Sequence, residues 1–437
     1  MTGPAPSAAS AGLYGRASRH VPGGVHSTTR ARKSGPFFAA RAAGAYVWDA
    51  DGTQYLDLQM GNGSVALGYA RPEVDAAVTE MISSGVTTGV ETAAAVAAAE
   101  AMAAVIPDCG MIRFANTGTE ALMHALAIAR HATGRDLVAK AEGAYHGWYD
   151  TLWVSTWAAA GQLGPASSPA APPGSAGLAA GAGTTVVLPF NDVAATTEIL
   201  RAQAGQLAAV VVEPVMIDIG FIPATGEYLT ALREVTRELG IVLIFDELLT
   251  GFRLAPGGAR QVYGIRPDLT TYGKAIANGY PVAAVEGDRA LMGTTDVTAG
   301  GPVGWVGTYN GHPTAMAATA AAVALLADGQ AQRQLSARNA ELRAGFAELA
   351  QRHGIPAVVP GEGGHFQPYF LDRDPASYRD ALHTDAVRYE AWRSAMEAAA
   401  ILVPQRPLLH CAFSTAHGPA EMARILEATD KAFSAMT

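Results

Sequence analysis

Between residues 111 and 313, short apolar runs alternate with segments whose apolar residues recur at helical spacing. A short continuous apolar run is typical of a strand that is buried on both faces of a sheet. Such strands, each followed by a helix, predict a mostly parallel, doubly wound α/β sheet. The runs cover residues 112–115, 137–139, 186–188, 208–214, 241–245 and 269–274.

The segments on either side of this region predict further structure. At 437 residues the chain exceeds the usual length of a single domain, so two or three domains are expected. We expect an N-terminal segment over 1–71 that forms part of a small domain, a large α/β domain over 72–320 and a small α+β domain over 321–437. A hairpin is predicted over 45–58, and helices over 12–20, 72–83, 92–106, 313–327 and 331–353.

Composition narrows the possible partners and compartment. Hydrophobic residues make up 49% of the chain and charged residues 16%, which is enough apolar surface for a large core. The net charge of −9, without a basic block, argues against nucleic acid as a partner. No run approaches the ~18 apolar residues of a membrane-spanning helix. The two cysteines, Cys109 and Cys411, lie far apart in sequence, and a reduced cytoplasmic protein is the simplest interpretation.

Four functional candidates fall where predicted strands end: Gly118, Glu213, Asp246 and Lys274. In open α/β sheets, the carboxyl edge of the strands is where ligands bind. A lysine can condense with an aldehyde, and a nearby carboxylate can keep a heterocycle protonated, as pyridoxal phosphate chemistry requires. Taken singly, each has a simpler explanation: most lysines are solvated, and Asp246 could cap a helix. The five apolar residues before Asp246 indicate deep placement, where an unpaired carboxylate is costly.

Other segments leave alternatives open. Residues 116–120, Asn-Thr-Gly-Thr-Glu, open a predicted helix whose N-terminus could bind a phosphate, or they could form only a capping box. Tyr145 could pack in the core or stack on a flat cofactor ring. Gly307-Thr308 is by itself only a turn. The Ala-, Gly-, Pro- and Ser-rich segment 158–184 could be a flexible linker or an active-site loop.

Other chemistries find little support in the sequence. The 11 histidines lack metal-ligand spacing, so no metal site is predicted. A Gly-x-Ser-x-Gly nucleophile elbow, a P-loop and a correctly spaced dinucleotide fingerprint are absent.

The motifs together resemble the class III, fold type I pyridoxal phosphate aminotransferases, and most closely the branch that contains glutamate-1-semialdehyde aminomutase. The resemblance covers nearly the whole chain, from Val21-Pro-Gly-Gly-Val to Ala416-His417. The motifs that carry it are 113–121 (RFANTGTEA), 142–147 (EGAYHG), 213–215 (EPV), 245–253 (FDELLTGFR) and 268–274 (DLTTYGK).

The resemblance implies a homodimer with shared active sites and a role for each matching residue. Lys274 would form the Schiff base with pyridoxal 5′-phosphate, Asp246 would pair with the ring nitrogen, and Tyr145 would cover the ring. Arg30 falls on the family's substrate-carboxylate arginine, for which a guanidinium fork is suited. The remaining cofactor-binding residues would be Gly118, Thr119, His146 and Glu213, with Thr308 reaching the phosphate of the neighbouring subunit.

Departures from the aminomutase pattern bear on the reaction. Trp157-Ala158-Ala159 stands where the aminomutase has a Gly-Ser-Gly gating segment, and a leucine, Leu408 or Leu409, replaces its C-terminal glutamate. Arg406 falls near a substrate-binding arginine of some aminotransferases in this branch, but it could equally be a solvated residue. We therefore predict an aminotransferase for a carboxylate-bearing amino acid, such as a β-amino or aromatic one, with Arg30, Arg406 and Trp157 at the substrate. The alternatives are a glutamate-1-semialdehyde-type 2,1-aminomutase and a racemase or epimerase.

Overall fold

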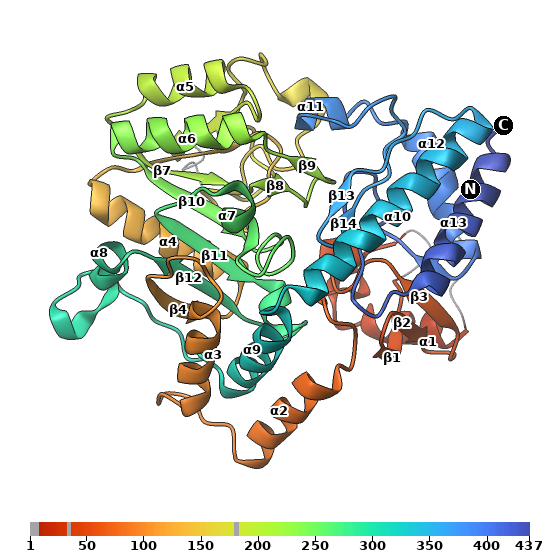
Figure 1. Ribbon diagram of the computed structural model, residues 1–437, viewed down its shortest axis with the longest axis horizontal. Coiled ribbons are helices and arrows are strands. Elements are labelled where there is room, and N and C mark those ends of the chain that lie inside the picture. The colour runs from red at the N-terminus through yellow and green to blue at the C-terminus, as the bar shows by residue number, and fades with distance from the viewer. Residues whose placement is uncertain (1–7, 33–35, 179–182) are drawn as a thin grey trace.

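The computed structural model describes residues 8–32, 36–178 and 183–437. Its centre is a seven-stranded sheet with the order β4-β12-β11-β10-β7-β5-β6 (Figure 1). β12 is antiparallel to both of its neighbours, and the other six strands share one direction. The strands are β4 (Met111–Ala115), β5 (Leu137–Ala141), β6 (Thr185–Leu188), β7 (Leu207–Val212), β10 (Val242–Glu247), β11 (Leu269–Gly273) and β12 (Ala283–Gly287).

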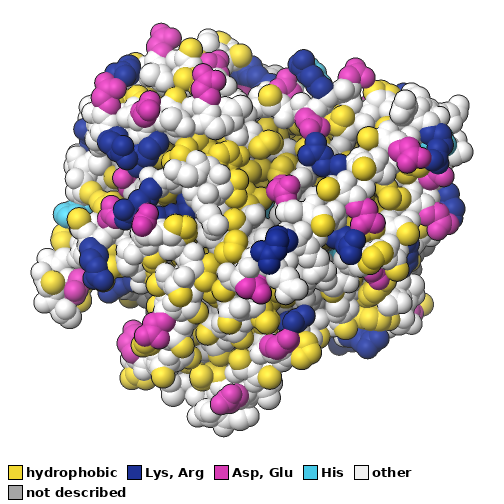
Figure 2. Space-filling model, viewed as in Figure 1, with side chains coloured by type: hydrophobic (Ala, Val, Ile, Leu, Met, Phe, Trp, Pro, Cys, Tyr) yellow, Lys and Arg dark blue, Asp and Glu magenta, His cyan; other side chains and the backbone are white. Residues whose placement is uncertain are grey.

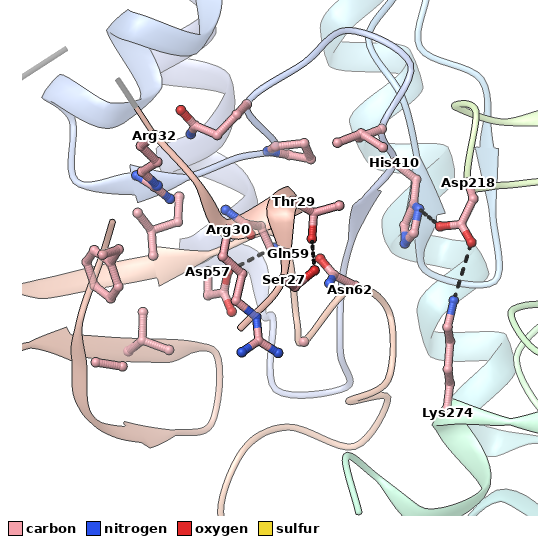
Figure 3. Close-up of a pocket in the computed structure, with 18 of the residues that line it drawn as sticks. Ser27, Thr29, Arg30, Arg32, Asp57, Gln59, Asn62, Asp218, Lys274 and His410 are labelled. Atoms are coloured by element: carbon pink, nitrogen blue, oxygen red, sulfur yellow. Dashed lines mark hydrogen bonds and ion pairs between the residues drawn. The ribbon is translucent and has the colours of Figure 1, made fainter. Parts of the chain in front are cut away.

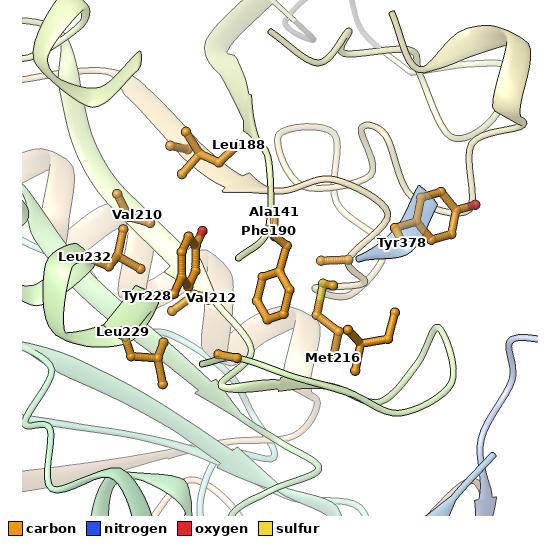
Figure 4. Packing of buried hydrophobic residues seen from close by; sticks show 14 of the residues in the cluster. Ala141, Leu188, Phe190, Val210, Val212, Met216, Tyr228, Leu229, Leu232 and Tyr378 are labelled. Atoms are coloured by element: carbon orange, nitrogen blue, oxygen red, sulfur yellow. The ribbon is translucent and has the colours of Figure 1, made fainter. Parts of the chain in front are cut away.

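Helices cover both faces of this sheet, which explains why β7, β10, β11 and β12 are buried along their whole length. On β7, Val210 and Val212 pack in one cluster with α5 and α6, whereas Ala209 and Val211 pack in another with α4. Figure 4 shows Val210 and Val212 beside Tyr228, Leu229 and Leu232. Because side chains alternate between the two faces of a strand, a strand covered on both faces buries every residue. These helices are α4 (Gly118–Thr133), α5 (Val193–Ala202) and α6 (Gly226–Leu239).

Other helices surround the edge of the sheet that carries β4. Helix α9 packs against α2 and α3, and all three contribute to one apolar cluster. Smaller elements lie in the connections that follow β7, β10 and β12. The bounds are α2 (Pro72–Ser83), α3 (Ala93–Ala103), α7 (Gly258–Tyr263), α8 (Arg289–Met292), α9 (Pro313–Leu326), β8 (Val215–Met216) and β9 (Ile222–Pro223).

The N- and C-terminal segments form a second apolar cluster beside the large sheet. A four-stranded sheet joins them, because β15 pairs in parallel with β3 and places Ile401 opposite Leu56. The long helix α10 and helices α12 and α13 pack together in this part of the molecule (Figure 1). The predicted boundaries at residues 71 and 320 remain predictions. The elements are α1 (Ala8–Ala17), β1 (Ala39–Ala43), β2 (Tyr46–Asp49), β3 (Gln54–Asp57), α10 (Gln330–His353), β13 (Gly361–Glu362), β14 (His365–Phe366), α11 (Tyr378–Ala381), α12 (Ala386–Ala398), β15 (Ile401–Leu402), β16 (Cys411–Ala412) and α13 (Pro419–Ser434).

The first helix begins earlier in the sequence than predicted. Helix α1 spans Ala8–Ala17, several residues before the predicted 12–20, since its alanine-rich start is itself a good helix former.

On the face shown in Figure 2, positive and negative side chains are interspersed, without a large area of one sign. Among the described residues, no helix is both long and apolar enough to cross a membrane.

A buried histidine in the small domain gives a stability prediction. The Ser414 N–H donates to Nδ1 of His417 at 3.1 Å, so Nε2 carries the proton and donates to the carbonyl oxygen of Asp57 at 3.2 Å. Burial lowers the pKa of His417 to about 4. Because the unfolded chain binds this proton more readily, the contribution of His417 to stability is lost as pH falls from about 6.5 toward 4.

We expect wild-type protein to lose about 2 to 3 kcal/mol of unfolding free energy relative to His417→Asn between pH 7 and pH 4.5. Asparagine keeps an acceptor for the Ser414 N–H but does not titrate. Urea unfolding of both proteins at the two pH values measures this, and titrations common to both cancel in the difference. An equal stability gap at both pH values would contradict the prediction.

Candidate active site

The site lies at the carboxyl ends of β10 and β11. These strands are parallel and in register, with Asp246 opposite Thr271. Lys274 follows β11 directly with a φ of 51°, a left-handed conformation that costs energy for a residue other than glycine. A strained residue at the end of a buried strand is typical of a functional position.

Asp246 and Glu247 are the last two residues of β10, whereas the sequence placed them just after the strand. Since successive side chains point to opposite faces, only one of the two can face the site. Glu247 accepts hydrogen bonds from the N–H groups of Ala259 and Arg260 in α7, so it stabilises that short helix. Asp246 faces the other way, toward the loop that carries His146.

The Asp246 carboxylate is already held by protein groups. One oxygen is 2.8 Å from Nδ1 of His146, and the other accepts from the Leu248 N–H at 3.1 Å and faces the Thr271 hydroxyl at 3.4 Å. Burial lowers the pKa of His146, while its bond to Asp246 opposes that shift. A neutral imidazole can donate from Nδ1 to Asp246 and so fixes the direction of the carboxylate. Sequence reasoning had expected a cofactor nitrogen alone to satisfy this acid.

Glu213 lies close behind Asp246. Its two carboxyl oxygens accept from the backbone N–H groups of Tyr145 at 3.4 Å and Ile217 at 3.2 Å. Burial, and then the negative charge of Asp246, raise the pKa of Glu213 well above its usual range. The neutral form of the Glu213 carboxyl group is therefore favoured at this edge.

The N-terminus of α4 lies at the same edge. Thr117 and Glu120 form a complete capping box, which was one of the two interpretations of this segment. A Cβ on Gly118 would lie 2.4 Å from a methyl carbon of Leu248, so a larger residue here would require that side chain to move. A cavity of about 240 Å³ is lined by residues of this turn together with those at the strand ends: Thr117, Gly118, Thr119, Tyr145, Gly147, Glu213, Asp218, Asp246, Leu248, Leu249, Lys274 and Val282.

This donor set suits pyridoxal 5′-phosphate. The helix N-terminus offers N–H groups and a positive dipole end for the phosphate. Lys274 offers an amine for the aldehyde, and Asp246 an oriented carboxylate for the ring nitrogen. Among the described residues, no group of three or more His, Cys, Asp or Glu side chains is placed to hold a metal ion.

Three aromatic side chains form a wall at the mouth of this cavity. Tyr145 and Trp157 stack with ring centroids 5.4 Å apart and planes 4° apart, and Trp153 meets both edge-on. The Trp157 indole N–H donates to the carbonyl oxygen of Asp218 at 3.1 Å. Trp153 and Trp157 therefore pack against the predicted ring-stacking residue, Tyr145.

A second, larger cavity of about 610 Å³ adjoins the first and shares Tyr145, Asp218 and Lys274 with it. Figure 3 shows Arg30 and Arg32 on the opposite side of this cavity from Lys274. Arg32 pairs with Glu397 at 3.2 Å, whereas Arg30 is exposed to the cavity and solvent. Arg30 thus lines the same cavity as Lys274, and its substrate role stays a prediction. The other lining residues include Ser27, Thr29, Phe37, Asp57, Gln59, Asn62, Trp157, Gln405, Leu409 and His410.

Two residues of this cavity, Asp218 and His410, were not predicted from the sequence. One carboxylate oxygen of Asp218 is 3.7 Å from Nζ of Lys274, and the other is 3.5 Å from Nδ1 of His410 (Figure 3). Burial lowers the pKa of His410 to about 4. Asp218 follows the short strand β8 and His410 precedes β16, and no sequence pattern connects these positions.

Two predicted residues do not join this group within one chain. Thr308 and Arg406 are exposed, and neither is among the residues that line the two cavities. Arg406 lies on the surface, in agreement with the solvated alternative, although the nearby Gln405 and Leu409 do face the larger cavity. The predicted substrate role of Arg406 stays a prediction.

Hydrogen bonds tie described residues of the segment 158–184 to Trp153 and to Tyr378 and Arg379 of α11, which argues against a free linker. Positions 179–182 lie outside the described residues. Gly174 N–H donates to the carbonyl of Trp153 at 2.8 Å, and the Tyr378 hydroxyl donates to the carbonyl of Ala158 at 2.8 Å. Arg379 forms an ion pair with Glu142 at 2.7 Å and also donates to three carbonyls of residues 163–165.

Comparison with known proteins places this geometry in a family. Residues 28–382 match the family described as Aminotransferase class-III. The chain is 37% identical to a glutamate-1-semialdehyde 2,1-aminomutase of Methanothermobacter thermautotrophicus, over 97% of this chain and 98% of that protein. An omega-transaminase from Sphaerobacter thermophilus superimposes with a TM-score of 0.93 at 36% identity, covering 98% of both chains. A transaminase solved with PLP bound superimposes with a TM-score of 0.88 at 32% identity, covering 98% of this chain and 97% of that one.

These matches confirm the predicted α/β fold of type I and the predicted cofactor, pyridoxal 5′-phosphate. They include both a transaminase and an aminomutase, so they fix the family and leave the individual reaction to be proposed. The chain belongs to the class-III aminotransferases.

Proposed function

We propose that this protein transfers an amino group between a carboxylate-bearing amino acid and a keto acceptor. The observation that carries the proposal is the position of Lys274 between two cavities. One cavity offers a phosphate site at α4 and the Asp246 carboxylate, and the other offers Arg30 for a substrate acid group. A reactive amine with a cofactor site on one side and a substrate site on the other is what amino transfer needs.

When bound, pyridoxal 5′-phosphate supplies an aldehyde that condenses with amines and a ring that withdraws electrons. The residues of the chain position the cofactor and the substrate and move protons. Asp246, fixed by His146, holds a proton at the ring nitrogen, and Tyr145 covers one side of the ring. Lys274, once its amine is free, would accept and return a proton at the reacting carbon atoms. Gly118 and Thr119 bind the phosphate through the helix N-terminus.

The aromatic wall favours an aminotransferase over a mutase. Trp157 is held by its stack on Tyr145 and its hydrogen bond to Asp218, at the position of the flexible gating segment of the resembling aminomutases. A mutase must retain its intermediate in a closed site, and a fixed tryptophan does not provide a gate. Trp157 also gives the substrate cavity an apolar side, which suits a β-amino or aromatic amino acid.

The test is a half-reaction of the cofactor-loaded enzyme with a panel of amino acids, including a β-amino acid and glutamate, without an acceptor. We expect bleaching of the visible cofactor band with stoichiometric release of a keto product. The aminomutase is the second candidate, because a curated relative at 37% identity carries that name. Turnover of glutamate-1-semialdehyde alone, without release of a keto product, would replace the proposal by the mutase. Solvent deuterium at Cα without amino transfer would indicate a racemase.

Replacement of Arg30 by glutamine should raise KM for a carboxylate-bearing amino acid about 10- to 100-fold, because a charge-assisted hydrogen bond contributes about 1.5 to 3 kcal/mol. KM for an uncharged amine should change little. The matched control is Arg406→Gln, since Arg406 is exposed and does not line the cavity. If instead Arg406→Gln raised KM and Arg30→Gln did not, the carboxylate site would belong at Arg406.

We also propose that the active enzyme is a homodimer. Val306 and Tyr309, which flank Thr308, are 88% and 60% exposed, and Trp148 beside the Thr119 turn is 64% exposed. Exposed apolar side chains near a cofactor site indicate a surface that another subunit covers. In such a dimer Thr308 of one subunit would reach the phosphate bound by the other. Sedimentation equilibrium at the monomer mass would exclude this arrangement.

A further inference from the structure

We propose that Lys140, a buried residue of β5 with no assigned role, is a positioning residue that holds the loop of residues 144–157 in place. This inference rests on the proposed function, because that loop carries Tyr145, His146, Trp153 and Trp157. Lys140 touches neither cavity, so it would act through the loop and not on substrate or cofactor.

The contacts of Lys140 converge on one loop. Its side chain is fully buried, and Nζ lies 2.6 Å from the carbonyl oxygen of Ala144, 3.0 Å from that of Leu152 and 2.7 Å from that of Val154. The hydroxyl of Thr156 is also 3.0 Å away. An ammonium has three N–H donors and no acceptor, so three carbonyls use its whole capacity.

Along the chain, the residues that accept from Lys140 are immediate neighbours of the aromatic residues of the site. Ala144 precedes Tyr145, and Leu152 and Val154 flank Trp153. Thr156 precedes Trp157 and hydrogen-bonds to the Ala144 carbonyl at 3.0 Å, which links the two ends of the loop. The loop lacks helix and paired strand over most of its length, so few of its carbonyls have regular backbone partners. The Lys140 ammonium therefore holds this loop in place through hydrogen bonds, where regular secondary structure is missing.

The buried positive charge of Lys140 is a further reason to assign this residue a positioning role. The three carbonyl oxygens and the Thr156 hydroxyl around Nζ are uncharged, and burial lowers the pKa of Lys140 to about 7. A buried strand position is normally filled by an apolar side chain, because a cation without a contacting carboxylate is costly to bury. Burial and, to a smaller extent, the charge of Lys140 also lower the pKa of His146, which keeps that imidazole neutral beside Asp246.

The primary test is Lys140→Met, which keeps the length of the side chain and removes the charge and donors. The chain contains only four lysines, and Lys431 is an exposed one whose partner is Glu427, so Lys431→Met is the matched control. Near-ultraviolet circular dichroism of the cofactor-free protein reports the coupled rings of Tyr145, Trp153 and Trp157. We expect a changed spectrum and a 10- to 100-fold lower kcat/KM for Lys140→Met only.

A second variant covers the case in which Lys140→Met does not fold. Thr156→Val removes one partner of the ammonium and the link to Ala144 but leaves the buried charge with its three carbonyls. It should shift the spectrum in the same direction and lower kcat/KM by a smaller factor. A folded Lys140→Met protein, or failing that Thr156→Val, with wild-type spectrum and kcat/KM would overturn the proposal. Because the spectrum needs no reaction, it tests Lys140 even if wild-type protein shows no amino transfer.

Discussion

Replacement of Lys274 by alanine is expected to abolish amino transfer, with a loss of at least about 10³-fold in kcat, and to remove the visible absorption of the bound cofactor. Two functions are lost at once: the amine that condenses with the aldehyde and the base that moves the proton. Alanine also keeps the residue in its left-handed conformation, at a φ of 51°, without a larger side chain to accommodate. The measurements are single-turnover kinetics and absorption spectroscopy.

Borohydride reduction provides a direct check on the same lysine. Reduction of the carbon–nitrogen double bond fixes the cofactor to the protein, so the mass of the Lys274 peptide should rise in wild-type protein. Lys431→Ala is the control, because Lys431 is on the surface and its loss should change neither spectrum nor rate. A visible band that persists in Lys274→Ala, or a cofactor mass found on another peptide, would show that the cofactor lysine is misassigned.

The second large effect is expected at Asp246. Asparagine is close to it in shape, so Asp246→Asn can keep the bond from the Leu248 N–H while the negative charge is removed. The ring nitrogen then loses the group that keeps it protonated. We expect kcat to fall about 10²- to 10³-fold, as for other losses of one preorganised electrostatic partner. Single-turnover rates with the best amino donor measure it.

Asp268→Asn is the matched control for this substitution. Asp268 lies just before β11, accepts from the Leu243 N–H at 2.7 Å and pairs with Arg233 at 3.0 Å, remote from both cavities. Its replacement should lower stability and leave kcat unchanged. If both variants lost kcat equally, the effect at Asp246 would be one of folding and not of cofactor electrostatics.

The architecture of the large domain was predictable because it depends on local patterns. Continuous apolar runs such as 208–212 can be satisfied only between two helical layers, and the sheet buries β7 on both faces. The capping box at Thr117 and Glu120 is similarly a matter of four adjacent residues. Lys274 and Asp246 were identified because strand ends meet at one edge, a rule that needs no knowledge of loop paths.

What the sequence could not decide involves residues that only folding brings together. His146 and Asp246 are 100 positions apart, yet their bond fixes the direction of the carboxylate. The role of Glu247, which accepts hydrogen bonds from α7 on the other face of β10, also follows only from packing. Asp218 reaches Lys274, and His410 in turn reaches Asp218, from two separate loops.

The sequence by itself therefore determined the doubly wound sheet, the family and the residues at its strand ends, since periodicity and short motifs encode these locally. The tertiary structure alone decided that Trp157 stacks on Tyr145 and that Arg30 shares a cavity with Lys274. It also decided that a buried Lys140 holds the loop that carries the aromatic wall. Each of these depends on the path of an irregular loop. Its conformation is fixed by hydrogen bonds and packing contacts with distant segments, which no local pattern records.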